Sequence, residues 1–222
     1  MNKTKIVLRG PLLSRSGYGE HARFALRSLR SIEDEIDIYV RIVGWGATSW
    51  TPEQTDEKKW INELAIKTVN YEQHGPPAYD VSLQVTIPNE WEKLAQFNIG
   101  YTAGIESTAI APQWITKANL MDRIIVTSNH SKFGFDNSSY SGQNPETGEV
   151  VHLETTTPII PVGYPVRKLD TEKVNLKLDT DFNFLSVAQW SIRKNLENTI
   201  GWFIEEFKDE EVGLILKANC AN

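Results

Sequence analysis

Short apolar segments alternate with amphipathic segments along most of the chain. At residues 6–8 an isoleucine, a valine and a leucine form an apolar run that stops at Gly10-Pro11, a pattern typical of a buried strand. Over residues 17–31 the apolar side chains recur at helical spacing and the charged ones lie elsewhere on the wheel. Because strand and helix patterns keep alternating, we predict βαβ units and a parallel, Rossmann-like sheet with helices on both faces.

The later elements are predicted from the same two periodicities. Further strands are expected at residues 36–43, 80–87, 97–101, 123–127 and 158–163, and helices at residues 52–69, 90–95, 112–121 and from residue 131 onwards. For the helix at residues 52–69, Thr51 is the expected N-cap and Pro52 the first helical residue. A loop or hairpin turn is expected around Gly148.

The pattern is interrupted once, at residues 170–181. This segment is charged and poor in large apolar residues, so it is expected to be a linker or a connecting helix. A strand, a helix and a strand are then predicted at residues 182–189, 195–207 and 212–218. We therefore interpret residues 1–168 as one domain, and residues 169–222 as a linker followed by the first βαβ unit of a second, incomplete Rossmann-like domain.

Composition narrows the class of protein. Of the 222 residues, 40% are hydrophobic and 23% are charged, which is typical of a globular protein with a sizeable core. The net charge of -6 and the lack of a Lys/Arg run argue against a nucleic-acid partner. A single cysteine, Cys220, excludes an internal disulfide. With no signal-peptide pattern and no apolar run near the ~20 residues of a membrane span, we expect a soluble, cytoplasmic protein.

The glycines near the N-terminus raise the question of chemistry. The stretch GYGEHA at residues 17–22 fits the dinucleotide-binding pattern G-x-G-x-x-G/A. In that fingerprint the first glycine directly follows the strand, whereas here residues 11–16 intervene, and no carboxylate ends the second strand. Gly17 and Gly19 open a helix whose N–H groups and dipole favour an anion such as a phosphate. A flexible loop with a glycine-softened helix start explains the same residues equally well.

Four further stretches resemble retaining glycosyltransferases of family 4, which have the GT-B fold. They are RGPLLSRSGYGEHAR, NIGYTAGIESTAIAPQWITKANLMDRIIVTSNHSKFGF, IIPVGYPV and FLSVAQWSIRKNLENTIGWF, which begin at residues 9, 98, 159 and 184. The resemblance implies transfer of a sugar from a nucleotide diphosphate sugar to a hydroxyl acceptor, with retention. The acceptor could be a sugar, a lipid or another alcohol. Neither a cofactor nor a metal is implied, and peripheral membrane association of the parent enzyme is compatible with it.

The chain departs from the family in two ways. The similarity covers only about half of a two-domain GT-B enzyme, and no segment fits the family's paired-glutamate motif E-x7-E. We therefore expect a truncated chain that is inactive alone. In addition, Gln189 stands where the family often has an arginine, while Lys194 matches the family's lysine.

Site residues follow from the resemblance and from the chemistry of a diphosphate leaving group, which needs cations and N–H donors. Gly17, Gly19, Arg193 and Lys194 are expected at the donor phosphates, although a solvated helix start also explains Arg193 and Lys194. Glu106 is the catalytic candidate, positioned to hold an acceptor hydroxyl or a developing positive charge. The alternative for Glu106 is the first turn of a helix capped by a neighbouring serine or threonine.

The acceptor side is expected to include Tyr18, His21, Ser107, Ser128 and His130. A cap of the next helix, formed by Ser128 or Ser131, is the favoured alternative to ligand contact. The histidines and the cysteine form no metal-ligand pattern. The tryptophans at positions 45 and 50 lie in a loop that could stack on a sugar or an aglycone.

Two other functions stay open at this point. One is a nicotinamide-dependent Rossmann oxidoreductase, for which the glycine pattern would be the fingerprint. The other is a nucleotide- or sugar-binding module without turnover.

Overall fold

The computed structural model describes residues 3–46, 48–51, 53–143, 148–166, 168 and 170–220. The chain divides into two compact units. We name Met1–Val166 the N-terminal unit and Arg167–Asn222 the C-terminal unit.

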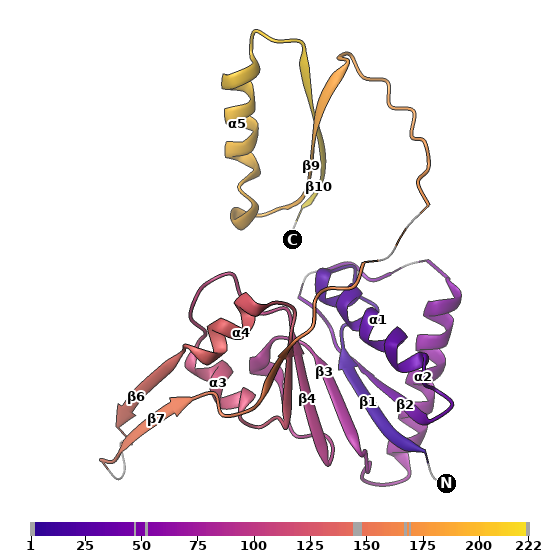
Figure 1. Cartoon of the computed structure of the whole chain (residues 1–222). Coiled ribbons are helices and arrows are strands. Elements are labelled where there is room, and N and C mark those ends of the chain that lie inside the picture. Colours follow the sequence, from indigo (N-terminus) through magenta and orange to yellow (C-terminus); the bar gives the residue numbers. More distant parts are fainter. Residues whose placement is uncertain are drawn as a thin grey trace. The chain divides into compact units, whose positions relative to one another are not determined.

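A six-stranded parallel sheet forms the centre of the N-terminal unit (Figure 1). Its order is β2-β1-β3-β4-β5-β8, and the strands are β1 (Thr4–Gly10), β2 (Ile36–Ile42), β3 (Val81–Val85), β4 (Phe97–Thr102), β5 (Arg123–Val126) and β8 (Ile159–Pro161). Helices α1 (Gly17–Arg30), α2 (Asp56–Gln73), α3 (Pro112–Ala118) and α4 (Asn129–Asp136) flank it. The predicted α/β, Rossmann-like fold is confirmed.

Side-chain alternation along the strands places core on both faces of the sheet. Leu8 of β1 packs in one cluster with Ala22 and Leu26 of α1. Its neighbour Val7 packs in a different cluster with Tyr39 and Tyr79. The sheet is therefore buried from both sides, as expected for parallel strands.

The order of the strands defines a topological switch point. β1 is paired with β2 on one side and with β3 on the other. The chain passes through α1 from β1 to β2, which lies on one side of β1. The next strand of the sheet, β3, lies on the other side of β1. In open α/β sheets, ligands bind outside the carboxyl ends of the strands at such a point. Here those ends are Gly10 of β1 and Val85 of β3.

The start of α2 differs from the prediction. The helix begins at Asp56, and its N-cap is Thr55, whose side chain accepts a hydrogen bond from the Lys58 N–H at 3.2 Å. Thr51 instead donates its backbone N–H and its hydroxyl to the Leu13 carbonyl, at 2.8 and 3.1 Å. Thr51 as N-cap was wrong because it is used to hold another loop, and Pro52 lies outside the described residues.

The helix predicted at residues 90–95 is also wrong. Only a 3-10 turn, η1 (Pro88–Glu90), forms there. Buried amide side chains take the backbone groups that a helix would use. Gln84 donates to the Glu92 carbonyl at 2.6 Å and accepts from its N–H at 3.1 Å. Asn98 Oδ1 accepts from the N–H groups of Leu94 and Ala95 at 2.9 and 3.1 Å.

A hairpin branches off before the last strand of the sheet. It consists of β6 (Ser139–Gln143) and β7 (Val150–Glu154), which are antiparallel, and in Figure 1 it points away from the six-stranded sheet. Gly148, at the expected turn, has a φ of +72°, which glycine adopts without strain.

The C-terminal unit is a βαβ unit. Strands β9 (Phe182–Trp190) and β10 (Val212–Cys220) pair in parallel, and a 3-10 turn, η2 (Ile192–Lys194), and helix α5 (Leu196–Phe207) connect them. Phe184 of β9 packs against Phe203 and Phe207 of α5, with ring centroids 6.0 and 5.3 Å apart. The described residues between 170 and 179 form no helix or strand, so that segment is a linker and not a connecting helix.

Candidate functional site

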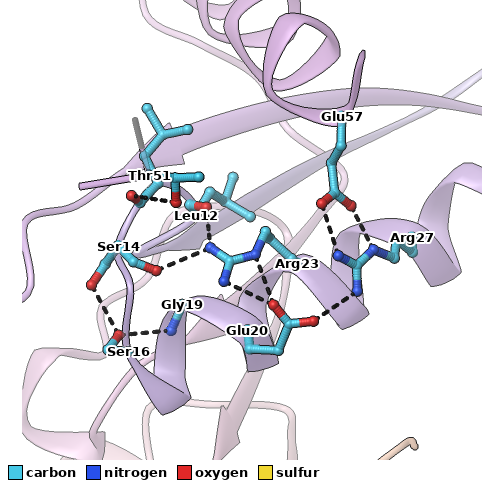
Figure 2. Close-up of polar contacts among 10 residues, drawn as sticks. Leu12, Ser14, Ser16, Gly19, Glu20, Arg23, Arg27, Thr51 and Glu57 are labelled. Atoms are coloured by element: carbon cyan, nitrogen blue, oxygen red, sulfur yellow. Dashed lines mark hydrogen bonds and ion pairs between the residues drawn. The ribbon is translucent and has the colours of Figure 1, made fainter. Parts of the chain in front are cut away.

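The loop between β1 and α1 lies at the switch point and is held by side chains (Figure 2). The Arg23 guanidinium reaches back from α1 and donates to the carbonyls of Leu12 and Ser14 at 2.8 and 3.0 Å. Glu20 fixes that guanidinium through an ion pair of 2.8 Å. Leu12 is fully buried. These contacts make residues 11–16 a fixed part of the unit.

A second segment, at residues 48–51, pairs with the same loop. The Arg15 N–H donates to the Ser49 carbonyl at 2.8 Å. The hydroxyls of Ser14 and Thr48 are 2.6 Å apart, and Ser14 forms an isolated antiparallel bridge with Trp50. These contacts argue against the alternative that the stretch is a flexible loop.

Gly17 and Gly19 have different physical reasons to be glycine. A Cβ on Gly19 would collide with the Ser14 carbonyl oxygen and would lie 3.1 Å from the Pro11 carbonyl oxygen. A Cβ on Gly17 would have no heavy atom within 4 Å. Gly19 is thus required by the packing of the loop on the helix. Gly17 is exposed and leaves its backbone open to an approaching ligand.

The start of α1 is only partly satisfied by its own cap. Ser16 Oγ accepts from the Gly19 N–H at 3.0 Å, and the Glu20 N–H donates to the Ser16 carbonyl. Within the described part of the chain, the N–H groups of Gly17 and Tyr18 make no hydrogen bond. These donors carry the positive end of the helix dipole and favour an anionic group.

Glu20 places a carboxylate in the same first turn, but two arginines neutralise it. Its oxygens are 2.8 Å from Arg23 and 3.1 Å from Arg27, and Arg27 also pairs with Glu57 of α2 (Figure 2). Burial alone would raise the pKa of Glu20, but the hydrogen bonds from Arg23 and Arg27 outweigh burial and lower it. The carboxylate therefore stays ionised and belongs to the scaffold.

Tyr18 joins the start of α1 to the end of β4. Its hydroxyl is 2.8 Å from Thr102 Oγ1 and accepts from the Ala103 N–H at 3.2 Å. Its ring packs on Trp45, with centroids 4.5 Å apart. Burial raises the pKa of Tyr18 against the effect of these hydrogen bonds, and the charges of Glu90 and Glu106 add to the rise. Both carboxylates therefore act electrostatically at this hydroxyl.

His21 is fully buried one turn further along the helix. Its ring lies edge-on to Tyr101 with centroids 4.0 Å apart, and the Tyr164 ring lies 4.9 Å away. Neither ring nitrogen has a hydrogen-bond partner among the described residues. Burial lowers the pKa of His21 to about 4, so the imidazole is neutral near pH 7.

Glu106 and Ser107 lie in the exposed loop after β4. The Ser107 hydroxyl donates to the Ala109 carbonyl at 2.8 Å. Helix α3 begins only at Pro112, with Ala111 as its N-cap. The alternative that Glu106 occupies the first turn of a capped helix was therefore wrong. The catalytic role of Glu106 stays a prediction.

Ser128 is the N-cap of α4, as the alternative to ligand contact predicted. Its Oγ accepts from the Ser131 N–H at 3.0 Å. The Ser131 hydroxyl in turn donates to the Ala103 carbonyl at 3.1 Å, which ties α4 to the loop after β4. His130 is exposed in the first turn of α4. Its contact with an acceptor stays a prediction.

Arg193 and Lys194 belong to the C-terminal unit. They end the turn η2, just before α5, and Asn195 between turn and helix has a φ of +52°. Arg193 lines a pocket of this unit together with Trp190, Ser191, Ile192, Asn195, Leu196 and Glu197. Whether Arg193 and Lys194 share a ligand with Gly17 and Gly19 stays a prediction.

Sequence reasoning missed three residues at the switch point: Arg23, Thr102 and Tyr164. Tyr164 lies in the stretch IIPVGYPV, and Arg23 ends the stretch RGPLLSRSGYGEHAR. The motifs therefore marked both segments without indicating that Arg23 fastens the loop or that Tyr164 covers His21. Thr102 lies in the stretch that begins at residue 98, and nothing in that stretch indicates its contact with Tyr18.

Three further observations concern the class of protein. In the part of the chain that the structure describes, no group of three or more His, Cys, Asp or Glu side chains could hold a metal ion. Within those same residues, no helix combines the length and the apolar character needed to cross a bilayer. Comparisons of the chain with protein-family models, curated proteins and solved structures give no match.

Proposed function

We propose that this chain takes part in retaining transfer of a sugar from a nucleotide diphosphate sugar to a hydroxyl acceptor. The observation that carries the proposal is the exposed start of α1, where the N–H groups of Gly17 and Tyr18 lack a partner among the described residues. They lie in the first turn of α1, directly after a loop that side chains hold at the switch point of a parallel sheet. Such an arrangement supports binding of a diphosphate, whose charge grows as the sugar leaves.

The other candidate residues take complementary roles. Arg193 and Lys194 supply positive charge to the same diphosphate from the C-terminal unit. Glu106 stabilises positive charge at the sugar or orients the acceptor hydroxyl. Tyr18, His21, Ser107 and His130 contribute to the acceptor side, whereas Ser128 acts through the cap of α4.

Two observations favour this function over a nicotinamide oxidoreductase. The loop between β1 and α1 is filled by the buried Leu12, unlike the tight turn of a dinucleotide fingerprint. The carboxylate that would bind a ribose is also missing from the end of β2. Asp37 lies near the start of that strand and pairs with Lys67.

The proposal is tested by amide NMR on the uniformly 15N-labelled 222-residue chain. We expect UDP or GDP to shift the Gly17 and Tyr18 amide signals with a dissociation constant in the millimolar range. Each charged hydrogen bond contributes roughly 1.5–3 kcal/mol, so a few such bonds give weak binding. NAD and NADP should give no micromolar binding by calorimetry.

The matched variants are Gly17→Val and Gly142→Val. Neither new side chain meets a neighbouring atom within 4 Å of its Cβ, so both proteins should fold. Only Gly17→Val should lose the nucleotide-dependent shifts, because its side chain blocks approach to the helix start. Absence of any shift at Gly17 and Tyr18 in the parent chain would contradict the proposal. Micromolar NAD binding that Gly17→Val abolishes would overturn the proposal in favour of a nicotinamide-binding site.

A further inference from the structure

His21 is a buried polar group that the scaffold leaves unexplained. Both of its ring nitrogens lack a partner among the described residues, and the side chain is fully buried. Nearly all buried polar groups in folded proteins are hydrogen-bonded, so both nitrogens of this imidazole have hydrogen-bonding capacity that a bound group could use. A phenylalanine would fill the same space among tyrosines without an unpaired nitrogen.

The side chain that covers His21 is weakly attached. Tyr164 lies on residues 162–166, which follow β8 without regular structure. The Val162 N–H donates to the Val126 carbonyl at 2.8 Å. Beyond it, no hydrogen bond of residues 163–166 occurs within the described chain. Tyr164 is 45% exposed although its ring packs against the fully buried His21. A small movement of this segment would therefore uncover the imidazole.

We propose that Tyr164 is a movable cover over a hydroxyl-binding subsite, in which the buried imidazole of His21 binds a hydroxyl group of an uncharged polyhydroxylated ligand. The inference rests on the proposed function, because the ligand would be the acceptor. It goes further by naming the acceptor class and the group that recognises it.

The chemistry of the surroundings selects an uncharged polyol. A neutral imidazole has one donor and one acceptor nitrogen, which match a hydroxyl that accepts one hydrogen bond and donates another. Glu90 and Glu106 act electrostatically on the Tyr18 hydroxyl, so an anionic ligand is disfavoured at that hydroxyl, in contrast to the N–H groups at the start of α1. The rings of Tyr18 and Tyr101 offer apolar surface to the carbon skeleton of a sugar.

The cover is tested by carbethoxylation of histidines with diethyl pyrocarbonate, which attacks accessible neutral imidazoles. Peptide mass spectrometry measures the rate at each histidine, and the exposed His74 and His130 serve as references in the same chain. Tyr164→Ala should accelerate modification of His21 about tenfold or more, because the barrier to local opening is removed. Tyr164→Phe keeps the ring and should react like the parent. Val166→Ala, at a 94% exposed position, is the control for the segment.

Glycerol then tests the subsite, since it is the smallest polyol that could enter. In Tyr164→Ala it should slow modification of His21 more than that of His130, and it should shift the ring 15N signals of His21 saturably. An unchanged His21 rate in Tyr164→Ala would overturn the cover. Equal slowing at both histidines, or ring signals that do not respond to glycerol, would overturn the subsite. Neither result depends on the nucleotide-induced shifts at Gly17, so the two proposals can fail separately.

Discussion

The chain contains two strand-to-helix junctions of the same kind, and they are built very differently. At the β1–α1 junction, Arg23 and the segment at residues 48–51 hold the loop, and Ser16 caps the helix. At the β9–α5 junction a short turn leads to Asn195 in the left-handed region, and no side chain caps α5. Both junctions are predicted to contact the donor phosphates. The first is held by side chains that reach it from elsewhere in its unit, whereas the described hydrogen bonds of the second join residues close in sequence.

The same contrast holds for the two cores. In the N-terminal unit large side chains such as Trp91, Tyr79 and Phe135 are almost completely buried. In the described part of the C-terminal unit, Leu196 is the only buried hydrophobic side chain, and Leu185, Val187 and Trp202 are each more than 60% exposed. An ordered helix start therefore depends on the core beneath it, as well as on local sequence.

The largest expected effect of this difference is on amide hydrogen exchange. Because the described part of the C-terminal unit buries so few large apolar side chains, the amides of β9 should exchange at least about a thousandfold faster than those of β1, equivalent to about 4 kcal/mol. Exchange measured by NMR at pH 7 checks this. Equal protection of Leu8 and Leu185 would show that the C-terminal unit is stabilised as well as the N-terminal one.

The next effect separates the two glycines of α1. Gly19→Ala puts a methyl group against the Ser14 carbonyl, which Arg23 holds in place. We expect a loss of about 3 kcal/mol in the free energy of unfolding, at the upper end for overpacking. Gly17→Ala meets no atom and should change stability by less than about 1 kcal/mol. Urea denaturation measures both, and similar losses would contradict the distinction.

His21 should make the N-terminal unit sensitive to acid. Its pKa is about 4 in the folded protein and 6.5 for an unperturbed histidine. Above pH 6.5 both states are neutral and His21 contributes nothing. As the pH falls towards 4, the unfolded chain takes up a proton that the folded chain does not, so stability is lost, approaching about 3 kcal/mol.

The variant His21→Phe removes this titration and leaves the carboxylates unchanged. Urea denaturation of both proteins at several values between pH 7 and pH 4 isolates the contribution of His21. The stability difference between them should shift in favour of the variant as the pH falls. Parallel pH profiles would show that the folded protein protonates His21 as easily as the unfolded chain does.

The sequence predicted the elements better than their connections, for a physical reason. Burial imposes a period of two on strands and of 3.6 on helices, so β1, α1 and β4 could be recognised locally. Thr51 and Thr55 are equally good caps by residue type, and only the distant Leu13 carbonyl decides between them.

For the candidate site, too, the sequence predicted the positions of residues along the chain but not their contacts with distant segments. The glycines could be placed at the start of a helix from the pattern alone. That Gly19 faces the Ser14 carbonyl, and that Tyr164 covers His21, depends on segments brought together by the sheet. Likewise, residues 91–95 have no helix because Gln84 and Asn98 bind their backbone. Such long-range contacts cannot be predicted from the helix or strand propensities of neighbouring residues.

Arg23 tests how far one side chain maintains the organised junction. Arg23→Met keeps the length and apolar stem but removes the donors to Leu12 and Ser14, and it leaves Glu20 with Arg27 alone. We expect a loss of about 2 kcal/mol, the scale of hydrogen bonds to a charged group. Arg30→Met, on an exposed residue of the same helix, is the control, and it removes the stacking of that guanidinium on Trp60 but no hydrogen bond to the loop. Equal stability of the two variants in urea would mean that the segment at residues 48–51 holds the loop by itself.

The smallest effect compares the residues that start the two helices. Ser16→Ala removes the acceptor for the Gly19 N–H and should cost about 1 kcal/mol, measured by urea denaturation of the N-terminal unit. Asn195→Gly removes no side-chain cap from α5 but removes the acceptor of an exposed hydrogen bond from the Asn198 amide at 2.8 Å. Glycine adopts a φ of +52° without strain. Replacement of a cap residue by glycine costs only a few tenths of a kcal/mol, and relief of the left-handed strain offsets that cost. The amide exchange rates of the first turn of α5 should therefore stay almost unchanged in Asn195→Gly. The rise in those rates can be converted to a free energy of local opening. If that value exceeded the loss in free energy of unfolding caused by Ser16→Ala, the β9–α5 junction would depend more on its first residue than the β1–α1 junction does.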